Sequence, residues 1–498
     1  MSKYKIPDSP FVYQNFVNGK YIGSSSKKTY DRESPGHDKL VGRYPLSNKA
    51  DTDDAIAVAK KTFKSDEWTR LTGLNREKII RKAAAIIRER AEELALIECL
   101  EVGKPIAQAL DEIEWAAGIW DYAATLARHI AGEVNTNVGK DMTAMMQKVP
   151  IGVVGMITPW NFPLLIISQK LPISIAAGCT SVVKPSEMAP GTTMLLGGIL
   201  KEAGLPDGVV NIVSGYGDPV GMTLAKSHDV DMISFTGSTS VGKYIVQASA
   251  GNLKRLELEL GGKNPQIIFP DADLDALIDA VVFGIYFNMG ECCNSGSRII
   301  IHEDIATEFE KRVIEHAKKV KVGDPLDPTV KVGAIINKAQ FDKVLNYIES
   351  GISQGAKLKL GGNPLESERG MYIAPTIFSD VTPEMDIACE EIFGPVLSIL
   401  KFKTMKQAIE IANGTDFGLS AGVWTRDLDT AMYMTRNIDA GTVWVNNWMS
   451  GYPEIPFGGM KQSGLGRELG PHAIDEFMET KSVLLKMGAK PGNWVIKE

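Results

Sequence analysis

The chain has 498 residues, more than one compact hydrophobic core accommodates, so two or three domains are expected. Its 44% hydrophobic and 23% charged residues are typical of a globular protein rather than a disordered one. The net charge of −7, with no basic run, argues against nucleic acid or an anionic membrane as partner. The first ten residues lack the apolar stretch of a signal peptide. The most apolar segment, 164–178, is interrupted by Gln169, Lys170 and Pro172, so no membrane span is expected.

The cysteines favour a reducing compartment. They are odd in number, and only two are adjacent: Cys99, Cys179, Cys292, Cys293 and Cys389. A disulfide framework is therefore not expected, and a cytoplasmic location is. No Cys-x-x-Cys or His-x-x-x-His spacing occurs, so no metal site is predicted.

The first 130 residues contain one hairpin pattern and two helical patterns. Two short apolar runs in 16–22 surround Asn18-Gly19, a pair that suits a turn with positive φ. Residues 51–63 open with acidic side chains, which favour a helix N-terminus. Residues 75–102 carry apolar positions at helical spacing and stop at Gly103-Lys-Pro105, which predicts one long helix.

From residue 150 onward, strand and helix patterns alternate. Buried strands are predicted at 149–157, 181–184, 209–213, 230–235, 297–301 and 395–402. Helices are predicted at 172–177, at 192–203, from 241 and at 305–320. Such alternation indicates parallel sheets with crossover helices, and we divide it into two α/β domains with a boundary near 261–271. The N-terminal hairpin and a strand-like tail, 481–486, are candidate edges for oligomerisation.

A cysteine pair lies in a segment of glycine and small polar residues, Phe287 to Arg298. Backbone amides and a nearby cation can lower a thiol pKa enough to create a nucleophile. The alternative is a pair of buried structural thiols, since free cysteine is commonly buried.

Two other segments place polar side chains beside turns. Glu257 and Glu259 alternate with leucines before Gly261-Gly262, where a carboxylate can act as general base or merely form a solvated face. Asn161, in Pro159-Trp-Asn-Phe-Pro163, follows a predicted strand, where its amide can donate to an oxyanion or belong to an ordinary turn.

A phosphate site is suggested by Phe235-Thr-Gly-Ser-Thr-Ser-Val-Gly242, which reads as strand, glycine turn and helix start. Amides at a helix N-terminus suit a pyrophosphate, although the glycine spacing is not G-x-G-x-x-G.

Together these segments closely resemble the aldehyde dehydrogenase superfamily over nearly the whole chain. The motifs that match in order and spacing are Pro159-Trp-Asn-Phe-Pro163, Glu259-Leu-Gly-Gly-Lys263, Gly290 to Arg298, Glu391-Ile-Phe-Gly-Pro395 and Phe457-Gly-Gly-Met-Lys-Gln-Ser-Gly464.

The resemblance implies oxidation of an aldehyde to a carboxylic acid with NAD, NADP being possible, through a thioester on Cys293. Cys293 stands three residues after Gly290, as in the family's Gly-Gln-x-Cys pattern, and Cys292 is then a bystander. Glu259 is implied as general base, Asn161 as oxyanion donor and Lys170 as proton relay. The implied cofactor-binding residues are Trp160, Lys184, Glu187, Gly217, Gly237, Ser238, Glu391 and Phe393. The implied substrate pocket contains Phe162, Phe287, Trp448 and Phe457.

The implied fold is α/β, with two Rossmann-like parallel-sheet domains and a small antiparallel oligomerisation element. We assign 1–130 and 150–261 to cofactor binding, 262–462 to catalysis, and 131–149 with 480–498 to oligomerisation. A homodimer or homotetramer is expected. By resemblance, Glu479 near the subunit interface is predicted to pair with Arg255 and Arg467.

The chain departs from the family pattern in places. Glu291 replaces the usual Gln before the nucleophile, and an ionised carboxylate close to Cys293 would raise the pKa of its thiol. Gln169 occupies a tunnel position that is often aromatic. In the loop 447–454, Trp448 and Tyr452 either cradle a substrate tail or simply pack.

Two other functions remain open at this point. A CoA-acylating semialdehyde dehydrogenase has the same fold, but such relatives typically lack the acid at the position of Glu259. A catalytically silent relative would lack the cysteine or the glutamate, and both are present. Glu187 favours NAD+ over NADP+, since a carboxylate accepts from the ribose 2′-OH and repels a 2′-phosphate.

Overall fold

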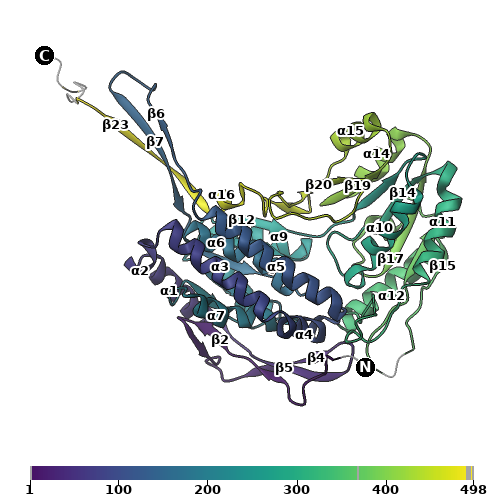
Figure 1. The fold of residues 1–498 in the computed structure, drawn as a ribbon, viewed down its shortest axis with the longest axis horizontal. Coiled ribbons are helices and arrows are strands. Elements are labelled where there is room, and N and C mark those ends of the chain that lie inside the picture. The colour runs from purple at the N-terminus through teal and green to yellow at the C-terminus, as the bar shows by residue number, and fades with distance from the viewer. Residues whose placement is uncertain (1–2, 367–368, 489–494, 496–498) are drawn as a thin grey trace.

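The computed structural model describes residues 3–366, 369–488 and 495. Two large sheets flanked by helices form two halves that lie side by side, and a narrow three-stranded arm projects from one of them (Figure 1). The predicted α/β class is confirmed. Within the described residues, no helix is long and apolar enough to cross a bilayer.

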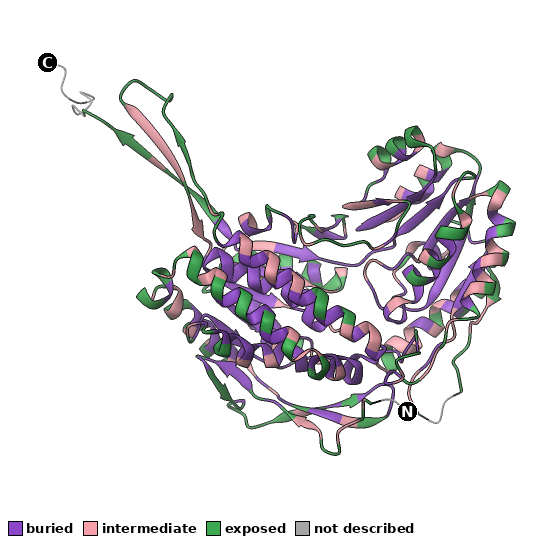
Figure 2. Ribbon diagram, viewed as in Figure 1, coloured by how far each residue is buried: buried purple, intermediate pink, exposed green. Residues whose placement is uncertain are grey.

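The first large sheet contains eight strands in the order β22-β12-β11-β8-β9-β10-β2-β3. Its parallel strands are β8 (Val153–Ile157), β9 (Thr180–Lys184), β10 (Val210–Ile212), β11 (Met232–Thr236) and β12 (Arg255–Glu259). Most of their residues are buried on both faces, because helices cover both sides of the sheet (Figure 2). This burial explains why the sequence shows continuous apolar runs here instead of alternation.

The predicted N-terminal hairpin is confirmed. Strands β2 (Asn15–Val17) and β3 (Lys20–Ile22) pair antiparallel, and the turn residues Asn18 and Gly19 have φ of 50° and 69°. Asn and Gly tolerate this left-handed conformation. Because β2 also pairs with β10, the hairpin completes one edge of the first sheet and is not part of the arm.

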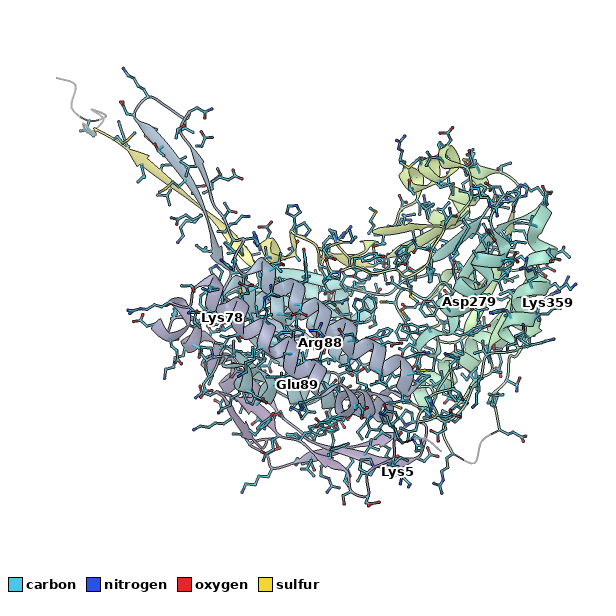
Figure 3. All side chains as sticks on the ribbon, in the orientation of Figure 1. Lys5, Lys78, Arg88, Glu89, Asp279 and Lys359 are labelled. Atoms are coloured by element: carbon cyan, nitrogen blue, oxygen red, sulfur yellow. The ribbon has the colours of Figure 1, made fainter. Side chains whose placement is uncertain are left out.

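The helices of the first half are α1 (Lys49–Phe63), α2 (Asp66–Thr69), α3 (Gly73–Glu89), α4 (Ala91–Val102), α5 (Ile106–Leu126), α6 (Pro163–Ala177), α7 (Gly191–Ala203), α8 (Met222–Lys226) and α9 (Thr239–Ala248). The single helix predicted at 75–102 is wrong, because α3 and α4 are separate and meet at Arg90. Helix α3 exposes one face, with Lys78 and Glu89 directed outward (Figure 3). Helix α4 is buried almost throughout from Leu94 onward, so the break lets the chain turn from the surface into the core.

The single strand predicted at 149–157 is also wrong. Strand β7 (Met142–Pro150) belongs to the arm, whereas β8 belongs to the first sheet. Gly152 separates them with φ of 136°, and a Cβ there would lie 2.0 Å from Asp231 Oδ2. The same Asp231 oxygen accepts the Val153 N–H at 2.8 Å, so the break is fixed by a close backbone approach that only glycine permits.

The second large sheet has the order β15-β16-β17-β14-β13-β19-β20 and is parallel except for β15. Its strands are β13 (Pro265–Ile268), β14 (Arg298–His302), β15 (Lys357–Leu360), β16 (Thr376–Ser379), β17 (Val396–Phe402), β19 (Ser420–Trp424) and β20 (Thr442–Val445). Its helices are α10 (Leu274–Tyr286), α11 (Glu303–Ala317), α12 (Lys338–Ser353), α13 (Asp386–Cys389), α14 (Met405–Asn413) and α15 (Leu428–Asn437). The chain passes from the first sheet to the second between Glu259 and Pro265, and it returns with β22 (Gly464–Leu465), which pairs with β12.

The arm consists of β6 (Glu133–Asn135), β7 and β23 (Met478–Lys486), all antiparallel. Most of its residues are exposed or only partly buried (Figure 2). The predicted oligomerisation segment 480–498 includes 489–494 and 496–498, which lie outside the described residues. At its base Arg255 donates to Glu479 at 2.7 Å, whereas Arg467 donates to the carbonyl groups of Gly459 and Gly466.

The remaining elements are short. They are β1 (Phe11–Val12), β4 (Thr29–Ser34), β5 (Lys39–Pro45), β18 (Phe417–Gly418), β21 (Met460–Lys461) and α16 (Ala473–Glu476), with single turns at Gly217–Gly221, Ser249–Gly251 and Phe287–Gly290.

Candidate active site

A cavity of about 460 Å³ opens between the two halves. Cys293 reaches it from the second half and Glu259 from the first. Most of the remaining wall is aromatic or aliphatic. The cavity therefore brings together a thiol, a carboxyl group and an apolar lining, which suits a small organic substrate.

Cys293 lies on a loop between α10 and β14 that contains three consecutive left-handed residues, Asn288, Met289 and Gly290. Asn264, at the crossing between the sheets, donates from Nδ2 to the Cys293 carbonyl oxygen at 2.7 Å. Cys293 is partly exposed and Cys292 is buried, although both line the cavity. The exposure difference favours Cys293 as the thiol that a substrate reaches.

The Cys293 thiol has a pKa well above its ordinary value. The hydrogen bond with the Cys292 thiol is the largest cause, followed by burial and by the nearby carboxyl groups of Glu391 and Glu259. In the absence of bound ligand the thiol is therefore mostly protonated at neutral pH.

Glu291 points away from the nucleophile. Its carboxyl group is fully buried and accepts the Ile336 N–H at 3.1 Å. Burial raises the pKa of Glu291 well above its ordinary range, and the nearest cations that oppose this shift are Lys104 and Arg32. The Glu291 carboxyl group is thus anchored to the Ile336 amide, and the carboxyl groups that raise the pKa of the Cys293 thiol are those of Glu391 and Glu259.

Asn161 lies directly beside the nucleophile loop. Its side-chain Nδ2 donates to the Glu291 backbone carbonyl oxygen at 3.1 Å, and its backbone carbonyl oxygen accepts from Asn288 Nδ2 at 3.1 Å. Asn288 Nδ2 also donates to the Glu291 carbonyl oxygen at 2.9 Å. This small network holds the side-chain amide of Asn161 against the backbone of Glu291, two residues before Cys293.

Glu259 ends strand β12 and is buried. Neither of its carboxyl oxygens has a hydrogen-bond partner in the part of the chain that the structure describes. Burial, reinforced by Glu468, raises the pKa of Glu259 well above its ordinary range. An unpaired buried carboxyl group is costly, and groups of this kind cluster at functional sites.

Lys170 lies on α6 and pairs with Glu468 at the edge of the cavity. Burial lowers the pKa of Lys170, but the carboxyl groups of Glu468 and Glu257 outweigh it, so that the net shift is upward. Burial raises the pKa of Glu257 to about 7. Lys170 therefore stays charged among three buried acids, one of which is Glu259.

The residues expected to bind the cofactor lie at the carboxyl edge of the first sheet. Lys184 ends β9, and its Nζ donates to the Pro185 carbonyl at 2.8 Å and to Glu187 at 3.3 Å. Ser238 caps α9, with its Oγ accepting from the Val241 N–H at 3.4 Å, and Gly237 follows β11. Gly217 begins the exposed turn beside Lys184.

Trp160, Phe393 and Glu391 join this edge to the second half. The Trp160 and Phe393 rings meet edge to face, with centroids 5.4 Å apart. Glu391 Oε1 accepts the Gly262 N–H at 2.9 Å, and a Cβ on Gly261 would lie 2.5 Å from Glu391 Oε2. Gly261-Gly262 therefore allows a carboxylate of the second half to approach the backbone closely.

These residues fit a dinucleotide. Three features face the same edge. They are the carboxyl group of Glu187, which is about one-third exposed, the capped N-terminus of α9, and buried polar atoms without partners among the described residues, such as Thr236 Oγ1. Such positions suit ribose hydroxyls and phosphates. Among the described residues, no group of three or more His, Cys, Asp or Glu is placed to hold a metal ion.

Three of the four residues expected in the substrate pocket line the cavity. Phe162 and Phe287 stack with centroids 5.8 Å apart, and Phe457 lies beside them in the wall. Trp448 does not line the cavity: it is 5% exposed and packs in the core of the second half. Gly284 and Gly422 provide its space, since a Cβ on either would lie within 2.8 Å of its ring.

Several wall residues were not anticipated from the sequence. They are Trp115 of α5, Phe283 of α10 and Trp444 of β20. None belongs to a motif, and each lies in a helix or strand whose pattern indicates only an amphipathic or buried element.

Comparisons with known proteins find relatives that match nearly the whole chain. The model of the Aldehyde dehydrogenase family matches residues 21–483. Aldehyde dehydrogenase family 2 member C4 of Arabidopsis thaliana is 41% identical, with 98% of this chain and 97% of that protein covered. Retinaldehyde dehydrogenase 3 of Homo sapiens is 42% identical, over 95% of this chain and 93% of that protein.

Solved structures are equally similar. The NAD-dependent aldehyde dehydrogenase from Sinorhizobium meliloti has a TM-score of 0.97 and 48% identity, covering 100% of this chain and 99% of that one. Indole-3-acetaldehyde dehydrogenase from P. syringae, solved with NAD+, has a TM-score of 0.94 and 40% identity, covering 97% and 98%. The chain therefore belongs to the aldehyde dehydrogenase family and is an NAD-dependent enzyme that oxidises aldehydes.

Proposed function

We propose that Cys293 is the nucleophile and Glu259 the general base in oxidation of an aldehyde to its carboxylic acid. The observation that carries this proposal is the shared cavity, into which a partly exposed thiol and an unpaired buried carboxyl group project from different sheets. Neither group has another structural task that would explain its position.

In the proposed reaction the Cys293 thiolate attacks the aldehyde carbon and forms a thiohemiacetal. Asn161 Nδ2 and the Cys293 N–H stabilise the oxyanion, because preorganised donors favour developing charge. Bound NAD+ supplies the hydride acceptor, and Trp160, Lys184, Glu187, Gly217, Gly237, Ser238, Glu391 and Phe393 are proposed to hold it. Loss of hydride leaves a thioester, and Glu259 takes a proton from the water that hydrolyses it. Lys170 and Glu468 are proposed to relay that proton outward.

Other outcomes for the thioester are less well supported. Transfer to CoA would not need a carboxyl base, yet Glu259 is buried and unpaired at the cavity. A catalytically silent relative would have no reason to retain an unpaired buried acid opposite an accessible thiol.

The cavity wall supports a neutral, apolar substrate. Among the residues that line it there is no Lys, Arg or His, and its only acids are Glu259 and Glu468. A substrate carboxylate would be buried there without a cation, which is unfavourable. The aromatic side chains instead match an aromatic or long aliphatic aldehyde.

We also propose a homodimer or homotetramer in which the arm contributes the contact. Exposed apolar side chains on the arm support this, including Val134, Leu484 and Met487, which are 65%, 66% and 57% exposed. A cytoplasmic location is supported by the cysteines, all five of which are free thiols.

Replacement of the two thiols should separate their roles. Cys293→Ala should abolish NADH production, whereas Cys292→Ala should retain most of it, because only Cys293 is proposed to bond to substrate. The measurement is NADH absorbance with a fixed aldehyde, with both variants checked for folding by circular dichroism. A dead Cys292 variant beside an active Cys293 variant would reverse the assignment.

The pH dependence should reflect the raised pKa of Cys293. Alkylation of the apoenzyme by iodoacetamide should accelerate from pH 7 to pH 9 without a plateau, since the thiolate fraction grows until pH reaches the thiol pKa. Cys292→Ala removes the largest cause of the shift, so its alkylation profile should move to lower pH. The readout is the mass of the labelled Cys293 peptide. Identical profiles for the two proteins would contradict this assignment of the cause.

The cofactor preference should depend on Glu187. We expect kcat/KM to be higher with NAD+ than with NADP+, and Glu187→Ser to narrow the ratio at least about tenfold, since a carboxylate repels a 2′-phosphate. Glu390→Gln, at a carboxylate that contacts Tyr347 on the second half, serves as the charge-matched control and should not change the ratio. Equal use of both cofactors by the unmodified enzyme would refute the argument from charge.

The charge of the substrate should strongly affect kcat/KM. We expect phenylacetaldehyde to exceed succinic semialdehyde in kcat/KM by about 100-fold, which corresponds to about 2.7 kcal/mol. Gln169→Arg should narrow this gap by supplying a cation at the cavity wall, whereas the size-matched Gln169→Met should not. If kcat/KM for succinic semialdehyde equalled that for phenylacetaldehyde, the proposal of a neutral, apolar substrate would be wrong.

A further inference from the structure

A buried ionic cluster lies beneath the loop that carries Asn161. It consists of Glu98 on α4, Lys104 just after α4 and Glu112 on α5, which are 1%, 1% and 3% exposed. Lys104 Nζ forms ion pairs with Glu112 and, at 3.5 Å, with Glu98. None of the three lines the catalytic cavity. A buried cluster of this kind is expensive to desolvate, so it needs an explanation other than stability.

Glu98 connects the cluster to the start of helix α6. Its Oε1 accepts the Leu164 N–H at 2.9 Å and the Thr192 hydroxyl at 3.1 Å. The residue at the N-cap of α6, Phe162, has no side-chain cap of its own. The Glu98 carboxylate therefore supplies the missing cap from another helix, at an N–H that lies three residues after Asn161.

Lys104 connects the cluster to the ring of Phe162. Its Nζ lies 4.6 Å from the ring centroid, within the range of a cation–π contact. The same ring stacks on Phe287 at the start of the nucleophile loop. Lys104 thus touches the residue that follows Asn161 and also orients the carboxylate that caps the helix.

A parallel contact from α5 holds the nucleophile loop. Gln108 Oε1 accepts the Asn288 N–H at 3.1 Å, and Asn288 in turn donates to the carbonyl oxygens of Asn161 and Glu291. The segment from Lys104 to Glu112 therefore contacts both the loop that carries Asn161 and the loop that carries Cys293. The relative position of these two loops determines where the Asn161 amide lies with respect to Cys293.

We infer that Lys104 is a positioning residue for the reaction: it fixes the Asn161–Phe162 backbone, through Glu98 and the Phe162 ring, in register with the Cys293 loop. This inference rests on the proposed role of Asn161 as oxyanion donor. A displacement of about 1 Å in such a donor costs substantial rate. Lys104 does not line the cavity that Cys293 and Glu259 share, so it acts through its neighbours.

The primary test replaces Lys104 by Met in the full-length enzyme, with Lys104→Arg as the charge-retaining control. We expect kcat per titrated active site to fall about 10- to 100-fold in Lys104→Met, with KM for NAD+ changed less than about threefold, and partial recovery in Lys104→Arg. The range is that of a weakened oxyanion donor. The rate of Cys293 alkylation by iodoacetamide should not change, because that displacement needs no oxyanion donor.

Loss of Lys104 alone leaves carboxylates buried without a cation, which can unfold the protein. The double variant Lys104→Met with Glu112→Leu replaces the shorter ion pair with apolar side chains and leaves Glu98 as the helix cap. It removes one of the two carboxylates with which Lys104 pairs, so it should be more stable than Lys104→Met and show the same fall in kcat.

A double-mutant cycle with Asn161→Ala decides whether the effect passes through the oxyanion donor. In the Asn161→Ala background, removal of Lys104 should change kcat less than about threefold, since the donor is already absent. Full additivity, unchanged kcat in the folded double variant, or a parallel loss of alkylation rate would overturn the inference. If Asn161→Ala alone left kcat unchanged, the proposed role of Asn161 would fail instead.

Discussion

The hydrogen bond from Asn264 Nδ2 to the Cys293 carbonyl oxygen joins the crossing between the two sheets to the nucleophile loop. The amide oxygen of Asn264 accepts the Ser420 N–H at 3.1 Å, so the same side chain is also anchored to the second sheet. Glu259 lies five residues before Asn264 on the other side of that crossing. The thiol and the carboxyl group come from different sheets, and their separation depends on how rigidly these few residues are held.

Near this crossing the protein buries four ionisable side chains, of which only Lys170 and Glu468 form an ion pair. Glu259 has no hydrogen bond among the described residues, while Lys170 stands among Glu468, Glu257 and Glu259. Burial raises the pKa of Glu257 to about 7 and raises the pKa of Glu259 well above its ordinary range. The large apolar cores of the two halves offset the free energy that is lost by burying these acids. On an exposed surface, the same acids would be ionised at neutral pH.

Much of the fold could be predicted, because burial and turn chemistry leave local traces. Asn18-Gly19 identifies its hairpin by a conformation that few other pairs adopt, and the buried parallel strands appear as apolar runs. The breaks at Arg90 and Gly152 were missed, since helical spacing continues through the first and the second depends on Asp231, which is distant in sequence.

In the candidate site, too, features with a local sequence signal could be predicted, and features that depend on distant residues could not. Residues that occupy motifs were placed by resemblance, and the structure brings Cys293, Glu259 and Asn161 to one region. Trp448 could not be placed from its neighbours, because its position depends on space left by Gly284 and Gly422. The direction of Glu291 depends on the Ile336 amide, a contact across 45 residues. Trp115 reaches the cavity from a helix of the first half, which no local pattern reveals.

The return of the chain to the first sheet has a consequence for the order in which the protein can be completed during synthesis. Strand β22 closes the β12 edge of that sheet, and β23 covers β7 of the arm along its whole length. Both strands follow β20, the last strand of the second large sheet, in the chain. A nascent chain that has already formed the second sheet still exposes the unpaired edges of β12 and β7, which are open to pairing with other chains. Strands that are synthesised after the second sheet therefore complete the half of the molecule that was made before it.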